Sequence, residues 1–198
     1  MSTAEASPPA DLRLPEPSLV VLMGASGSGK STFARTHFKA TEIVSSDQCR
    51  GVVSDDENDQ SATDEAFALL HHIVAIRLAA GRLTVVDATN VEPAGRRNLV
   101  TLARAHDVPP VAIVLDLPER LCARRNSTRT DREVGRDVIR RQRDDLHGGL
   151  TGLGREGFAT VHVLATPEDV ERAVVVRSRD LVETWPPQTP RRQPEPPA

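Results

Sequence analysis

A glycine-rich segment between an apolar run and a predicted helix constrains this chain more than any other feature. Residues 24–31 are Gly-Ala-Ser-Gly-Ser-Gly-Lys-Ser and fit the P-loop pattern G-x-x-x-x-G-K-[ST]. Residues 19–23 are apolar, with a proline before them and a glycine after, which predicts a buried strand. A helix is expected from Thr32 onward. Because a strand, a tight turn and a helix form the context in which such a loop binds phosphate, a mere flexible turn is a poor alternative.

Each residue type in this loop has an expected role in binding the phosphates of ATP. Backbone N–H groups would surround phosphate oxygens, and the helix N-terminus adds partial positive charge. Gly27 and Gly29 let the backbone approach the phosphates without a Cβ. Lys30 is expected to reach the β- and γ-phosphates, and the Ser31 hydroxyl to ligate Mg²⁺. The expected nucleotide-binding residues here are Gly24, Ala25, Ser26, Gly27, Ser28, Gly29, Lys30, Ser31 and Thr32.

Length and composition bound the class of protein. The 198 residues suffice for one well-buried domain, and 38% hydrophobic with 27% charged residues suit a soluble protein. The net charge of −3 gives no global attraction to nucleic acid. Cys49 and Cys122 match no zinc pattern, and we expect no disulfide. No apolar run approaches the ~18 residues of a membrane helix and no secretory segment opens the chain, so we expect a cytoplasmic protein.

Strands and helices are predicted to alternate along the chain. The strands are expected at about 18–23, 41–46, 83–87, 110–116 and 159–164. The helices are expected at about 32–38, 61–81, 93–105, 118–125, 130–146 and 167–182, with loops at 51–60 and 148–157. This alternation predicts β-α-β units, a parallel sheet and ligands at the carboxyl ends of its strands. We expect one α/β domain over 18–184, between a disordered N-terminal segment (1–17) and a disordered proline-rich tail (185–198).

Aspartates follow three of the predicted strands. Asp47 has Arg50 three residues later, and this pair could accept a proton from an attacking hydroxyl or simply cap a turn. Asp87 ends an apolar strand and resembles an aspartate that assists Mg²⁺, although it could instead hold the neighbouring loop in place. Asp116 precedes Leu117-Pro118 and indicates a structural turn or helix cap.

An arginine-dense segment lies between the fourth and fifth predicted strands. Residues 120–143 hold nine of the 23 arginines of the chain, which has only two lysines. Many of these arginines are therefore expected to be ordinary surface cations. Arg125 and Arg129 are four residues apart and can share a face of a helical lid. Arginines in that position would neutralise charge on a transferred phosphoryl group, so we expect both to bind the nucleotide and act in catalysis.

Six segments in this order resemble the kinase domain of bacterial polynucleotide kinase-phosphatase, a P-loop family that phosphorylates 5′-hydroxyl ends. The resemblance runs from about Leu19 to Val170. Its marks are GASGSGKSTF at 24–33, SSDQCRG at 45–51, SDDENDQ at 54–60, TVVDATN at 84–90, RNxxRTDR at 125–132 and REGF at 155–158. The loop motif alone is generic, whereas the combination is much more specific. Unlike larger members of the family, this chain has a proline-rich tail after the domain and no dimetal phosphatase pattern.

The resemblance implies a P-loop NTPase three-layer sandwich with five parallel strands in the order 2-3-1-4-5 and an arginine-rich helical lid. It places the family's general base on Asp47, an orienting and acceptor-contacting arginine on Arg50, and phosphate-binding lid arginines on Arg125 and Arg129. The implied reaction moves the γ-phosphate of ATP, with Mg²⁺, to the 5′-hydroxyl of DNA or RNA. A separately encoded phosphatase or ligase would then be its partner.

Two alternatives remain from the sequence. The same fold could phosphorylate a small metabolite or nucleoside, which the acidic net charge favours mildly. It could also be an ATPase switch that binds a protein partner through the proline-rich ends. The Asp47 and Arg50 pair argues against a switch, because a switch needs no general base there.

Overall fold

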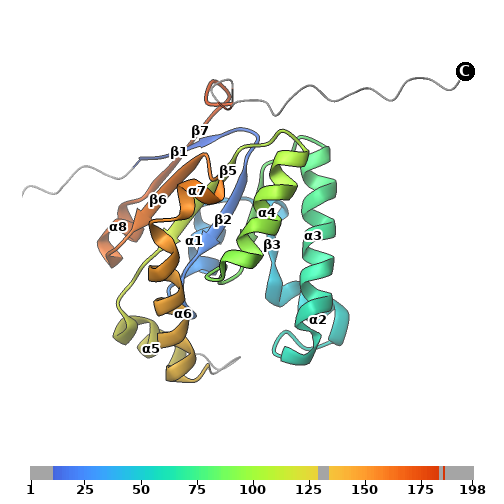
Figure 1. The fold of residues 1–198 in the computed structure, drawn as a ribbon. Coiled ribbons are helices and arrows are strands. Elements are labelled where there is room, and N and C mark those ends of the chain that lie inside the picture. Colours follow the sequence, from blue (N-terminus) through green and yellow to red (C-terminus); the bar gives the residue numbers. More distant parts are fainter. Residues whose placement is uncertain (1–10, 129–133, 183–184, 186–198) are drawn as a thin grey trace, which may run out of the picture.

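Five short apolar runs form the strands of a central parallel sheet (Figure 1). The computed structural model describes residues 11–128, 134–182 and 185. The strands lie in the order β3 (Ile43–Ser45), β4 (Thr84–Asp87), β2 (Leu19–Met23), β5 (Pro110–Leu115) and β6 (Thr160–Leu164). Counted along the sheet-forming strands, this is the expected order 2-3-1-4-5. The prediction of a P-loop NTPase-like sandwich is therefore confirmed.

The register of the sheet brings three predicted site segments to one edge. Asp87 at the end of β4 pairs with Ser45 at the end of β3 and with Leu22 near the end of β2. All of these pairings are parallel, so the three chains leave the sheet in the same direction. The segment after β2 is the P-loop, and the segment after β3 contains Asp47. These segments therefore lie close together because their strands are neighbours in the sheet.

Strand side chains alternate between two apolar layers. On one face, Val21 and Val86 belong to a cluster with residues of α3 (Thr63–Ala79), α4 (Pro93–Ala105) and the end of α6 (Arg136–Leu150). On the other face, Val20 and Val85 pack with α1 (Lys30–His37) and with Leu12 and Leu14. Figure 1 shows the helices lying along the two faces of the sheet. The remaining helical segments are η1 (Ala40–Glu42), α2 (Ser46–Ser54), η2 (Gln60–Ala62), α5 (Glu119–Ser127), α7 (Leu153–Glu156) and α8 (Pro167–Arg172).

A second, two-stranded sheet corrects the predicted start of the domain and the predicted length of its last helix. β1 (Asp11–Pro15) pairs in parallel with β7 (Val174–Ser178), so the prediction of disorder is wrong for residues 11–15. Leu12 and Leu14 alternate with exposed residues and are buried, a pattern that neighbouring prolines conceal in the sequence. The last helix ends at Arg172 instead of about Val182, because the β-branched run Val174-Val175-Val176 is better suited to a strand.

The two segments predicted as loops, at 51–60 and 148–157, are partly helical. Residues 46–54 form α2, whose N-terminus is capped by the Ser45 side chain accepting a hydrogen bond from Gln48 N–H at 3.4 Å. The glycines after Gly148 do not end α6 at once, because it extends to Leu150 and α7 follows. The other helices lie within a few residues of their predicted bounds, apart from the start of α6.

Some predictions fall outside the described residues. The proposed start of the lid helix near Thr130 and the lid residue Arg129 lie in the gap at 129–133. Residues 1–10 and all of the proline-rich tail except Trp185 are also outside the described part. Among the described residues, no helix has the length and apolarity needed to cross a membrane.

Candidate active site

The P-loop occupies the turn between β2 and α1. Gly27 and Gly29 have φ angles of 80° and 98°, in the left-handed region that favours glycine. A Cβ on Gly27 would collide with the backbone carbonyl of Cys122 in α5, so the loop also packs too closely for a side chain. Lys30 opens α1, is 8% exposed, and donates from Nζ to the carbonyls of Gly24 at 2.8 Å and Ala25 at 3.0 Å. The lysine thus lies directly against the loop it was predicted to serve.

A large cleft of about 1320 Å³ begins at this loop. Its lining includes the P-loop, the ends of β3 and β4, and residues of α2, η2, α3, α5 and α6. Lys30, Ser31, Asp47, Arg50, Asp87 and Arg125 all line it. The fold therefore brings together every predicted catalytic or metal-binding residue that the structure describes. This volume is large enough for a nucleotide together with a second substrate.

The segment after β4 supports the P-loop from behind. Gly24 N–H donates to the Thr89 carbonyl at 3.0 Å, and the Asn90 side-chain amide donates to the Leu22 carbonyl at 2.7 Å. Asn90 is buried and has a left-handed φ of 49°, which asparagine tolerates better than most residues. These bonds fix where β2 ends and the loop begins. The segment after Asp87 therefore supports the P-loop, in addition to any role of Asp87 in binding a cation.

Asp87 fits the role of a cation-assisting carboxylate. Its side chain is at the end of β4, lines the cleft and is only 7% exposed. Within the described part of the chain, its carboxylate has no hydrogen bond or ion pair. A buried carboxylate without a partner is costly, and a divalent cation beside the phosphates would offset that cost. The Ser31 hydroxyl lines the same cleft and is the natural second oxygen ligand.

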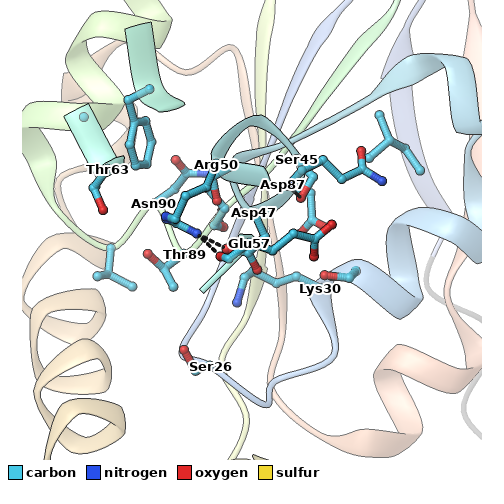
Figure 2. Close-up of a pocket in the computed structure, with 18 of the residues that line it drawn as sticks. Ser26, Lys30, Ser45, Asp47, Arg50, Glu57, Thr63, Asp87, Thr89 and Asn90 are labelled. Atoms are coloured by element: carbon cyan, nitrogen blue, oxygen red, sulfur yellow. Dashed lines mark hydrogen bonds and ion pairs between the residues drawn. The ribbon is translucent and has the colours of Figure 1, made fainter. Parts of the chain in front are cut away.

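Asp47 and Arg50 form an ion pair in the same cleft. Asp47 lies in the first turn of α2, whereas the sequence predicts a residue that directly follows a strand. Arg50 Nη1 donates to Asp47 Oδ1 at 2.7 Å and to the Glu57 carbonyl at 2.8 Å. Arg50 is 4% exposed, so its guanidinium is held in place and in turn fixes the carboxylate. Figure 2 shows Asp47, Arg50 and Glu57 gathered in the cleft that Lys30 also lines.

Helices α5 and α6 close the P-loop side of the cleft. Arg125 in α5 donates from Nη1 to the Ser28 carbonyl at 3.4 Å and is exposed to the cleft. Gln142 in α6 accepts a hydrogen bond at its Oε1 from Ser26 N–H at 2.8 Å. Gln142 was not predicted, because one glutamine among arginines carries no sequence signal. Asp116 does not line the cleft and instead contacts His147 of α6 at 2.7 Å, whereas the N-cap of α5 is Pro118.

The first turns of α3 add an unpredicted wall to the cleft. Thr63, Asp64, Phe67 and His71 line it, and the rings of Phe67 and His71 have centroids 6.2 Å apart. Burial lowers the pKa of His71, so its ring is neutral at pH 7. In the sequence these residues indicate only one face of an amphipathic helix. Their position beside Asp47 becomes evident once α2 and α3 pack together.

Comparisons with known proteins agree with this geometry. A family model described as an AAA domain, AAA_33, matches residues 19–153. The chain belongs to this AAA domain family. It is also 30% identical over 169 residues to transcription factor bHLH140 of Arabidopsis thaliana, a match that covers 79% of this chain and 17% of that protein. The chain thus spans less than a fifth of that relative's length.

Solved structures share the fold. A chain of the Pnkp1/Rnl/Hen1 RNA repair complex is similar with a TM-score of 0.60 and 23% identity, covering 70% of this chain and 46% of that one. A gluconokinase from Sinorhizobium meliloti 1021 has a TM-score of 0.54 and 18% identity, covering 86% and 92%. The AAA domain has the fold of a P-loop kinase, and its nucleotide-binding loop follows the carboxyl end of the central strand β2.

Proposed function

We propose that this domain transfers the γ-phosphate of ATP to the 5′-hydroxyl end of a polynucleotide. The observation that carries the proposal is the Asp47–Arg50 pair, which lines the same cleft as the P-loop lysine. A nucleotide switch or a simple ATPase does not require a carboxylate fixed by a buried arginine at that position. A kinase requires one, because its acceptor hydroxyl must lose a proton during transfer.

The side chains divide the work as follows. Asp47 accepts the proton of the attacking hydroxyl, and its ion pair with Arg50 orients the carboxylate. Lys30 and Arg125 stabilise negative charge on the transferred group. Arg129 is proposed to join them from the lid. Ser31 and Asp87 would hold Mg²⁺, which neutralises charge on the β- and γ-phosphates when it is bound.

Two observations support a polynucleotide acceptor. The described fold resembles a chain of an RNA repair complex, and the segments at 45–51 and 54–60 that resemble polynucleotide kinases form α2 and the acceptor side of the cleft. Phe67 gives that side an aromatic surface on which a nucleobase can stack. A separate phosphatase or ligase is proposed to act on the same ends, and the likeness to a chain of an RNA repair complex supports a role alongside such partners.

A small-metabolite kinase is the second candidate. The gluconokinase likeness extends over most of both chains, which favours a domain that works without additional modules. The cleft is polar enough for a sugar acid, with Gln60, Thr63 and Asp64 on its acceptor side.

Transfer of label from γ-labelled ATP distinguishes these functions. The acceptors offered would be 5′-hydroxyl DNA and RNA oligonucleotides, the same oligonucleotides with 5′-phosphates, and a panel containing gluconate and nucleosides. The proposal expects labelled oligonucleotides only when the 5′-hydroxyl is free. Label on a small acceptor alone would favour the second candidate. Release of phosphate with no labelled acceptor would contradict both and favour the ATPase switch.

A further inference from the structure

A buried arginine outside the cleft contacts both the loop after β4 and the last turn of α6. Arg96 in α4 is 0% exposed and does not line the cleft. Its Nε and Nη2 donate to Glu156 of α7 at 2.7 and 2.6 Å, a bidentate pair. Its Nη1 donates to the carbonyls of Asn90 at 3.1 Å and Val91 at 2.5 Å. Helical side chains point toward their own N-terminus, which is why Arg96 reaches the residues just before α4.

The first end of this connection is the loop that supports the P-loop. Residues 88–91 follow Asp87, and Thr89 and Asn90 make the hydrogen bonds to Gly24 and Leu22 described above. Arg96 holds the carbonyls of the same loop, so it fixes the loop on the side away from the cleft. Removing these donors would leave two buried carbonyls without partners.

The second end is the lid helix α6. A Cβ on Gly149 would lie 2.6 Å from Arg96 Nη2, so the guanidinium lies directly against the last turn of α6. Gln142, which contacts Ser26 N–H, precedes Gly149 by seven residues, or about two helical turns. Both residues therefore lie on one face of α6. That face contacts the P-loop at one point and Arg96 at the other.

Stability alone does not account for such an arrangement. A buried ion pair costs desolvation energy and can often be replaced by apolar side chains without loss of stability. We propose that Arg96, fixed by Glu156, is a positioning residue that sets the register of α6 against the loop after β4. Through this register it places Gln142 on the P-loop and Asp87 at the phosphates. The effect on catalysis rests on the proposed phosphotransfer function, whereas the connection itself does not.

Adjacent glycines on α6 provide a matched test. Gly149→Ala adds a methyl group against the Arg96 guanidinium, whereas Gly148→Ala adds the same group where nothing lies within 4 Å. Both changes favour the helix, so both variants are expected to fold. Gly149→Ala should lower kcat for phosphate transfer by about tenfold or more, because small displacements of reacting groups are costly. It should also speed hydrogen exchange at the amides of residues 88–91, which needs no acceptor. Gly148→Ala should change neither property, and equal behaviour of the two variants would overturn the proposal.

The second test uses two similar ion pairs. Arg177 donates to both oxygens of Glu42 at 2.8 Å, but this pair lies between β7 and η1, away from Arg96. Arg96→Lys should lower kcat by about 10- to 100-fold with an unchanged acceptor KM, at a temperature where circular dichroism shows a folded protein. Arg177→Lys should lower the Tm and leave kcat unchanged. Unaltered kcat in Arg96→Lys would contradict the inference.

If the proposed function is wrong, the wild-type protein itself will fail, which distinguishes that outcome from failure of the Arg96 proposal. If the wild-type protein labels no acceptor at all, phosphotransfer is wrong, yet hydrogen exchange at residues 88–91 and calorimetric ATP affinity in Gly149→Ala still test the connection.

Discussion

The P-loop comes from one continuous segment, whereas the proposed acceptor side of the cleft is assembled from α2, η2 and α3. On the first side, the Lys30 position follows from neighbouring residues and a single turn geometry. On the second side, Asp47 and Phe67 are twenty residues apart and line the same cleft because α2 packs on α3. The difference teaches that the P-loop is encoded locally, whereas the proposed acceptor side depends on tertiary packing. Substitutions on the two sides should therefore separate ATP binding from acceptor use.

The largest effect is expected on the donor side at Lys30. Lys30→Ala removes the buried cation of the P-loop that is proposed to bind the phosphates, so both ATP affinity and transition-state stabilisation should fall. We expect kcat/KM for ATP to drop by about 10³-fold or more. Steady-state kinetics with calorimetric ATP titration would measure this, and unchanged ATP affinity would break the assignment of Lys30 to the donor side.

Arg125 should affect the rate more than nucleotide binding. Arg125→Ala removes the guanidinium that lies over the P-loop, and we expect kcat to fall by about 10²- to 10³-fold with little change in ATP affinity. Arg124→Ala is the matched control, because Arg124 is the adjacent arginine of α5 and does not line the cleft. Equal losses in both variants would indicate a general effect of surface charge.

Phe67 tests the acceptor side. Stacking of a base on an aromatic ring contributes about 1–3 kcal/mol, so Phe67→Ala should raise the KM for a 5′-hydroxyl oligonucleotide by about tenfold. The ATP affinity should stay the same. Ile76→Ala is the control on the same helix, since Ile76 is 57% exposed and does not line the cleft. A change in ATP affinity without a change in acceptor KM would remove Phe67 from the acceptor side.

The smallest expected effect concerns pH. Burial lowers the pKa of His71 on the acceptor side and of His37 on α1, whereas an unfolded histidine titrates near about 6.5. Below that pH the unfolded state binds more protons than the folded state, so the free energy of unfolding should fall as pH drops from about 7 to about 5.5. Urea unfolding at several pH values would measure the slope. His71→Gln and His37→Gln should each flatten it, and unchanged slopes would show that neither ring is shielded.

The sequence predicts the sheet and the donor loop well, because both depend on local patterns. The apolar runs and the glycine-rich motif identify β2 and the P-loop, and Asp87 follows from its strand. The sequence predicts Asp47 as a site residue directly after a strand; it lines the cleft but lies in α2, whose N-cap Ser45 is also the last residue of β3.

Features that depend on distant contacts are missed. β1 and β7 are five-residue strands from opposite ends of the domain, and neither has a clear pattern without the other. Arg96 is one of 23 arginines in the chain, and only its burial against Glu156 distinguishes it. Gln142 reaches the P-loop only through the packing of α6. Such residues carry no local signal, since their roles come from partners more than fifty residues away.

The most direct test of the account is transfer by Asp47→Asn compared with Asp55→Asn. Asp55 is exposed at the C-terminus of α2 with a φ of 61°, which asparagine also tolerates, so it is a control of identical chemistry. Single-turnover transfer from labelled ATP to a 5′-hydroxyl oligonucleotide would be measured together with ATP affinity. We predict that Asp47→Asn binds ATP normally and loses about 10²- to 10⁴-fold in transfer rate, whereas Asp55→Asn behaves as wild type. Transfer by Asp47→Asn at the wild-type rate would contradict the central claim that this carboxylate activates the acceptor hydroxyl.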